Sequence, residues 1–170
     1  MENESWDAVK SKAVKENRMI FMDCYTSWCG PCKALAKDIF TRKDVGDFFN
    51  ANFINVKYDM EKGVGKDLYK HYKSNIIGFP TLLLINKEGK VVHQMAGFQE
   101  ANVLIDGMKA GMEGKSLFTY KDRYAAGERE LAFLKDYVVA LEGAFLKDDI
   151  EKIILDYMKT IPVEKSVSYT

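Results

Sequence analysis

Cys29 and Cys32 have the residue type and the spacing that reversible disulfide chemistry needs. An apolar run at 19–22 predicts a buried strand before the pair, and the residues after it have helical spacing. Two cysteines three positions apart at a helix start lie on the same side of its first turn, close enough to form a disulfide. Pro31 fits between them because a first-turn residue has no intrahelical acceptor for the N–H that proline lacks.

Cys29 is the predicted nucleophile of this pair. Unpaired backbone N–H groups and the positive end of the helix dipole favour an anion at its position. Such a site can lower the pKa of a thiol from about 8.5 to near 7, which corresponds to roughly 2 kcal/mol. Cys32, one turn deeper, is the predicted resolving thiol, which attacks the mixed disulfide on Cys29 and releases the reduced substrate.

A structural disulfide and half of a zinc site are the alternative uses of the pair. A structural zinc ion takes four ligands, whereas the sequence has no second cysteine pair and its two histidines, His71 and His93, stand apart. We therefore expect redox catalysis, no metal, and histidines that are structural or solvated. The redox-active Cys29–Cys32 disulfide would need no further cofactor.

The segment 28–33, Trp-Cys-Gly-Pro-Cys-Lys, resembles the active site of the thioredoxin family residue for residue. The segment 78–81, Gly-Phe-Pro-Thr, is similar to that family's cis-proline loop. Asp23 stands where the family keeps a buried carboxylate beneath the second cysteine. The resemblance covers roughly residues 5–114, and it implies a thioredoxin-like fold and a thiol–disulfide oxidoreductase.

Asp23 is a carboxylate within an apolar strand. Burial would raise its pKa and make it a proton acceptor for Cys32, directly or through a water. The alternative is a surface residue at the end of the strand. Typical thioredoxins have a buried lysine near the position of Asn55, and here Lys57 follows two residues later on the same strand face. Whether a lysine tunes Asp23 is left open by the sequence.

Cys24 alternates to the opposite face of the strand from Asp23. A buried and inert thiol is the simplest interpretation. The family usually has an aromatic residue at this position, so a regulatory disulfide stays open as the alternative.

Substrate docking is predicted around Pro80. If a strand at 81–85 lies antiparallel beside the strand at 19–24, Pro80 comes to lie opposite the cysteine pair. The resemblance implies a cis peptide bond there, so that Phe79 exposes its N–H and C=O to an extended substrate. Trp28 is expected to lie over the site and limit solvent access. The predicted substrate-binding residues are Trp28, Gly30, Pro31, Phe79 and Pro80.

The elements that must position these residues follow from hydrophobic periodicity and turn signals. Strands are predicted at 19–24, 53–58, 81–85 and 91–95. Helices are predicted at 5–17, 66–72 and 101–112, and another begins at Cys29. A further short helix is predicted to start at a capping box formed by Thr41 and Asp44. The glycines at 63–65 are predicted to be a plain connector, because they lack the pattern of a phosphate loop. This order predicts an α/β protein, a thioredoxin-like fold with a central mixed sheet flanked by helices.

The character of the sequence changes after residue 114. Apolar residues spaced by three and four predict a short helix at 118–126 and a helical hairpin at 131–145 and 150–161. We therefore predict a thioredoxin-like domain at 1–114 and a helical extension at 115–170, with a polar, loose tail at 164–170. Its apolar stripes serve core packing or, alternatively, the docking of a partner. The resemblance also allows this chain to be one segment of a longer protein.

Composition excludes several classes of function. Lysine plus arginine and aspartate plus glutamate number 25 each among 170 residues, so no basic field would recruit nucleic acid or an anionic membrane. No apolar segment reaches the ~20 residues of a membrane span, and the start lacks the features of a signal peptide. Three cysteines are too few for a disulfide framework.

The expected function is the reduction of protein disulfides through a mixed-disulfide intermediate. The direction rests on Gly30-Pro31, because thioredoxin has the same dipeptide and a reduction potential near −270 mV. Alternatives are an isomerase or oxidase, or an interaction module whose helical extension binds a partner. The resemblance to envelope proteins of the disulfide-isomerase type implies an exported, periplasmic setting, with a membrane thiol reductase as electron donor. A cytoplasmic setting is the alternative.

Overall fold

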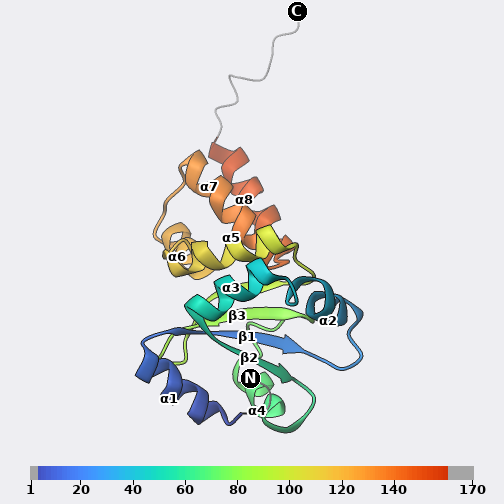
Figure 1. The fold of residues 1–170 in the computed structure, drawn as a ribbon. Helices are drawn as coiled ribbons and strands as arrows, with labels where there is room; N and C mark the ends of the chain where they lie inside the picture. The colour runs from blue at the N-terminus through green and yellow to red at the C-terminus, as the bar shows by residue number, and fades with distance from the viewer. Residues whose placement is uncertain (1–3, 161–170) are drawn as a thin grey trace, which may run out of the picture.

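A computed structural model describes residues 4–160, and Figure 1 shows how their elements are arranged. In chain order these elements are α1 (Trp6–Glu16), β1 (Met19–Tyr25), α2 (Gly30–Ala34), the π-helical turn η1 (Leu35–Ile39), α3 (Lys43–Asn52), β2 (Phe53–Asp59), α4 (Gly63–His71), β3 (Thr81–Ile85), β4 (Val91–Ala96), α5 (Ala101–Met112), α6 (Leu117–Ala125), α7 (Leu131–Gly143) and α8 (Lys147–Thr160). The predicted α/β fold with a helical extension is confirmed.

The four strands form one mixed sheet in the order β2-β1-β3-β4. β1 runs parallel to β2 and antiparallel to β3, and β4 pairs antiparallel with β3. The register places Cys24 beside Thr81, so the end of β1 meets the start of β3. This is the arrangement that the sequence predicted for bringing Pro80 to the cysteine pair.

Helices cover both faces of the sheet (Figure 1). Successive residues of β1 point to opposite faces. Ile20, Met22 and Cys24 join a core cluster with residues of α1 and α4, whereas Phe21 joins a second cluster with residues of η1, α3 and α5. Both faces are buried, so β1 is apolar at nearly every position, as a central strand with two covered faces requires.

Two helix starts differ from the prediction. Gly65 lies inside α4, because it packs directly on β2: a Cβ there would come within 2.0 Å of the Asp59 carbonyl oxygen. The prediction of a capping box at Thr41 is wrong. Helix α3 begins after Arg42, and the Thr41 hydroxyl instead donates to the carbonyl of Lys37 at 2.5 Å. A local side-chain motif does not decide a helix start when the preceding turn offers another acceptor.

The extension α6–α8 has a core of its own, which includes Leu117, Tyr137 and Leu141. It lies over β4 and α5, on the opposite side of the molecule from α1 and α4 (Figure 1). The break predicted at 147–149 is the first turn of α8. The predicted helix end at Ile161 and the tail at 164–170 lie outside the described residues. Within residues 4–160, no helix is both long enough and apolar enough to cross a bilayer.

Candidate active site

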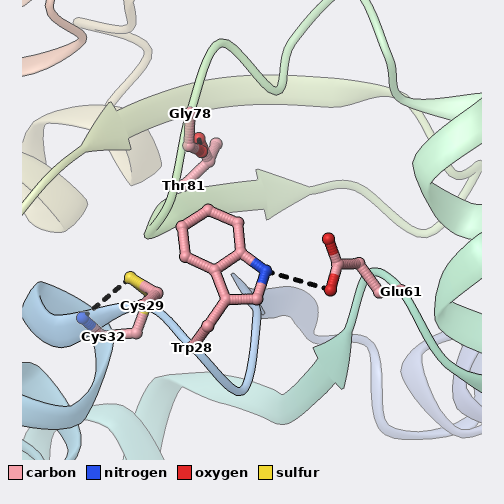
Figure 2. Close-up of a disulfide and its surroundings, with 6 residues drawn as sticks. All are labelled: Trp28, Cys29, Cys32, Glu61, Gly78 and Thr81. Carbon is pink, nitrogen blue, oxygen red and sulfur yellow. Dashed lines mark hydrogen bonds between the residues drawn. A yellow bond between two sulfur atoms is a disulfide. The ribbon is translucent and has the colours of Figure 1, made fainter.

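Cys29 and Cys32 form a disulfide at the amino end of α2, with their Cα atoms 5.3 Å apart. Cys29 is the N-cap residue, and its Sγ accepts a hydrogen bond from the backbone N–H of Cys32 at 3.1 Å (Figure 2). Pro31 occupies the first turn, as predicted. In the dithiol form the same N–H and the helix dipole favour a thiolate on Cys29 over a thiolate on Cys32.

The helix that carries this turn is anchored on the sheet by its π-helical continuation. The N–H of Phe40 donates to the carbonyl of Leu35 at 3.0 Å, five residues back. This extra residue per turn places Leu35 and Ile39 in the core cluster between α3 and α5. The apolar spacing predicted a helix here, although it does not distinguish an α-helical from a π-helical turn.

Asp23 is buried beside the disulfide. A cavity of about 150 Å³ has both Asp23 and Cys32 among its lining residues, together with Lys57 from β2. Burial raises the pKa of Asp23 to about 7. Within residues 4–160, its Oδ1 atom has no hydrogen-bond partner. The cavity has room for water next to the unpaired Asp23 oxygen, and a bridging water would let a proton pass between this carboxylate and Cys32.

Lys57 answers the question that the sequence left open. The parallel register of β1 and β2 pairs Asp23 with Lys57, whereas Asn55 pairs with Phe21. The ammonium charge of Lys57 partly offsets the effect of burial and so lowers the pKa of Asp23. The same ammonium lies 6.0 Å from the centre of the Tyr25 ring. A lysine therefore does act on the carboxylate, and it is Lys57 rather than a residue at position 55.

Trp28 stands at the outer side of the disulfide (Figure 2). Its indole N–H donates to Glu61 Oε2 at 3.0 Å, and its ring meets the Phe79 ring edge-on at 6.1 Å between centroids. The side chain is 65% exposed, whereas Cys29 and Cys32 are buried. Trp28 thus bridges the loop after β2 and the loop before β3, at the entrance to the cysteine pair.

Glu61 and Lys62 are site neighbours that the sequence analysis missed. Lys62 contacts the Ser27 hydroxyl at 3.2 Å and the Asp59 carboxylate at 3.1 Å. The signal was available in the parallel pairing of β1 with β2, because parallel neighbours end at the same edge of a sheet. Residues that follow Asp59 must therefore lie beside residues that follow Tyr25.

The Phe79–Pro80 peptide bond is cis. The Thr81 hydroxyl donates to the Gly78 carbonyl at 2.7 Å, and the Gly97 N–H donates to the Pro80 carbonyl at 2.8 Å. Among the described residues, no hydrogen bond uses the backbone N–H or C=O of Phe79. The loop is therefore fastened on either side of a backbone unit that is available to an extended peptide.

The remaining predicted residues take simpler places. Gly30 and Pro31 are exposed in the first turn of α2. Cys24 is a free thiol, fully buried on the face opposite Asp23, and burial raises its pKa. His93 is buried in β4, as a structural histidine. Within residues 4–160, no three His, Cys, Asp or Glu side chains are grouped to hold a metal ion.

Comparison with known proteins decides the family. The model of the family described as "Thioredoxin-like domain" matches residues 6–111. The chain belongs to this family. A thioredoxin-like thiol–disulfide oxidoreductase with Cys29–Cys32 as its CXXC redox pair accounts for both the match and the geometry. Helices α6–α8 lie beyond the matched residues.

Individual relatives agree with this assignment of the thioredoxin-like domain. A solution structure from Bacteroides thetaiotaomicron, of a protein provisionally designated a disulphide-isomerase, is 42% identical, with a TM-score of 0.59 over 66% of this chain and 91% of that one. Protein disulfide-isomerase of Datisca glomerata is 27% identical over 56% of this chain. Thiol:disulfide interchange protein DsbD of Actinobacillus pleuropneumoniae is 30% identical over 54%. The matched part spans only 18% and 16% of the lengths of these two curated proteins.

Proposed function

We propose that this oxidoreductase works as a reductant of protein disulfides. The Cys29 thiolate attacks one substrate sulfur, so a Cys29–substrate disulfide forms and the other substrate sulfur leaves as a thiolate. Cys32 loses its proton and attacks the Cys29 sulfur. The Cys29–Cys32 disulfide then forms, and the second substrate sulfur leaves as a thiol. Two electrons pass to the substrate, and an upstream dithiol reductase must restore the reduced pair.

The observation that carries this proposal is the shared cavity of Asp23 and Cys32. The second step needs a base for the Cys32 thiol, and the most effective base has a pKa near the working pH. Burial gives Asp23 a pKa of about 7, and the cavity supplies room for a water between the two groups. A merely structural disulfide has no use for a buried carboxyl group that costs stability when it ionises.

Substrate docking on Phe79 belongs to the same proposal. An extended peptide that pairs with the free N–H and C=O of Phe79 would lie along the start of β3, where Trp28 contacts the Phe79 ring. Gly30 and Pro31 are exposed at the other side of the disulfide, so they would contact the substrate near its reactive sulfur.

Reduction of insulin disulfides tests the catalytic claim. Wild type should reduce insulin with dithiothreitol as donor, and Cys29→Ser should not. Cys32→Ser should accumulate a mixed disulfide through Cys29, which mass spectrometry detects. Cys24→Ser is the matched control and should keep full activity, because this thiol is buried away from the site. Equal rates for wild type and Cys29→Ser would leave the interaction-module alternative in place of catalysis.

Disulfide isomerisation is the second candidate, because the Bacteroides relative designated a disulphide-isomerase is 42% identical. Gly30-Pro31 favours reduction, since the same dipeptide occurs in thioredoxin at about −270 mV, whereas protein disulfide isomerase lies near −180 mV. Equilibration of the Cys29–Cys32 pair with glutathione separates the two. A potential below about −240 mV supports the reductase, and one above about −200 mV contradicts it.

An exported setting completes the proposal. It is supported by the resemblance to envelope proteins of the disulfide-isomerase type, in which a membrane thiol reductase would supply the electrons. Fractionation of the source cells, with antibody detection of the chain, tests it. Recovery in the periplasmic fraction is expected, and recovery with cytoplasmic markers would favour the cytoplasmic alternative.

A further inference from the structure

One residue of the helical extension reaches the proposed substrate loop. Phe145, in the turn between α7 and α8, packs on the backbone of Gly97: a Cβ added to Gly97 would lie 2.0 and 2.5 Å from two carbons of the Phe145 ring. The N–H of Gly97 in turn donates to the carbonyl of Pro80 at 2.8 Å. Gly97 therefore connects Phe145 of the extension to Pro80, the residue that follows Phe79.

The backbone of the extension holds Phe145 in this position at a cost. Phe145 has a left-handed φ of 57°, which is uncommon for a bulky residue. Its N–H donates to the carbonyl of Glu142 at 3.0 Å, and the N–H of Leu146 donates to the carbonyl of Leu141 at 3.0 Å. Ala144 beside it is fully buried in the extension core, whereas Phe145 is 52% exposed. The turn thus directs an aromatic ring out of its own core.

Other exposed apolar side chains lie on the loops around Pro80 and Gly97 or, as Trp28 does, contact Phe79. Phe98 follows Gly97 directly and is 38% exposed, Ile77 lies two residues before Phe79 and is 48% exposed, and Trp28 is 65% exposed. Strained backbone and neighbouring exposed apolar side chains are features that are frequent at binding sites. Phe145 is continuous with this group through Gly97, although it comes from outside the family-matched residues.

We propose that Phe145 extends the substrate-binding surface and selects polypeptide disulfides that carry an aromatic or aliphatic side chain within a few residues of the reactive cysteine. A peptide paired with Phe79 would continue past Pro80 and Gly97 and place such a side chain against the Phe145 ring. This inference rests on the proposed reduction of protein disulfides. A small disulfide does not extend beyond the two cysteines, so its reduction does not depend on Phe145.

Steady-state kinetics of the full chain test this inference. The substrates are two disulfide-linked peptides that differ only in having phenylalanine or serine near the cysteine, together with bis(2-hydroxyethyl) disulfide. Phe145→Ala should raise KM for the phenylalanine peptide roughly fivefold or more and leave kcat unchanged. Phe145→Leu should raise it less. KM for the serine peptide and the rate with the small disulfide should not change.

Leu155→Ala is the matched control, because Leu155 is an exposed apolar residue of α8, at 57%, whereas the atoms nearest to a Cβ at Gly97 all belong to Phe145. It should behave as wild type with all three substrates. Equal KM changes for both peptides, or none, would overturn the role of Phe145 in selection. Slower reduction of the small disulfide by both Phe145 variants would also overturn it, since the ring would then support the Pro80 loop. If wild type reduced none of the three, the proposed function itself would fail.

Discussion

At the scale of single residues, the two cysteines depend on a carboxylate that the sheet keeps out of water. Asp23 ionises near neutral pH because burial outweighs the attraction of Lys57. The lysine lies in β2 at the position paired with Asp23, so one register fixes both the carboxylate and its counter-charge. Burial of Asp23 lowers the stability of the fold when the carboxyl group ionises, and it also gives the carboxylate the pKa that a base needs near neutral pH.

Asp23→Asn should stabilise the oxidised protein above pH 7. The folded-state pKa of Asp23 is raised from 3.8 to about 7, so the folded protein binds more protons than the unfolded chain between these values. Stability from this group is therefore present below about pH 4 and is lost as pH rises to 7. Urea unfolding should show Asp23→Asn more stable than wild type by roughly 2–4 kcal/mol at pH 8, with little difference at pH 4.

The exposed Asp38, on η1, offers a control for this measurement. Asp38→Asn should leave the unfolding free energy within about 0.5 kcal/mol of wild type at both pH values. A pH-independent effect of Asp23→Asn would mean that the carboxyl group is not ionised by pH 8 or is not buried, and the proton-transfer role would lose its basis.

Residue types and the resemblance to thioredoxins together indicated the candidate residues of this site. Cys29 and Cys32 are identifiable because they are spaced for a disulfide at a helix start, and Asp23 is identifiable because it is a carboxylate within an apolar strand. Lys57 was a candidate without a decision, since only the strand register shows which residue of β2 faces Asp23. Glu61 was not predicted, because its contact with Trp28 joins two loops that are 33 residues apart in sequence.

At the scale of elements, the start of α4 is set by contact with the sheet rather than by helix propensity. Gly63 and Gly65 are poor helix formers, and the sequence predicted a connector there. The helix nevertheless includes them, because its first turn lies directly on the backbone at Asp59. Apolar periodicity predicts which segments are helices. It does not predict a close approach between the backbones of two elements, because that approach depends on the tertiary structure.

Gly65→Ala should lower the free energy of unfolding by roughly 2 kcal/mol or more, because the new Cβ would collide with the carbonyl of Asp59 at 2.0 Å. Gly46→Ala is the matched change in α3, where a Cβ meets nothing within 4 Å, and it should stabilise by about 0.5–1 kcal/mol. Chemical denaturation of both variants checks the contrast. Equal effects would show that α4 can begin elsewhere without loss.

At the scale of the whole molecule, a hydrogen bond between β4 and α6 joins the sheet to the extension. The Nδ1 atom of His93, in β4, accepts the N–H of Leu117 at the start of α6 at 3.2 Å. Around it α6 and α7 pack on β4. Gly143 of α7 lies near the Met95 side chain, and Gly111 of α5 lies against the His93 ring. The imidazole must stay neutral for this contact, since a protonated ring would present N–H to N–H.

The contribution of His93 to stability should fall as pH decreases from about 6.5 towards 4, opposite in sign to the contribution of Asp23. Burial lowers the pKa of His93 to about 4, so the unfolded chain binds a proton in this interval that the folded chain does not. The stability that His93 contributes is therefore fully present above pH 6.5 and is lost as pH falls. Hydrogen exchange at the Leu117 amide should accelerate at pH 5 relative to pH 7, after correction for intrinsic rates. His93→Gln should remove this pH dependence, and His71→Gln, at an exposed histidine, should retain it.

The burial of Cys24 has a practical consequence for every assay of this enzyme. Alkylating reagents added to the native protein will not reach that sulfur, so native labelling registers only the Cys29–Cys32 couple. After denaturation the oxidised protein yields one labelled cysteine and the reduced protein yields three. The mass of the denatured, alkylated protein therefore reports the redox state of a sample, because the label on Cys24 is present in both states.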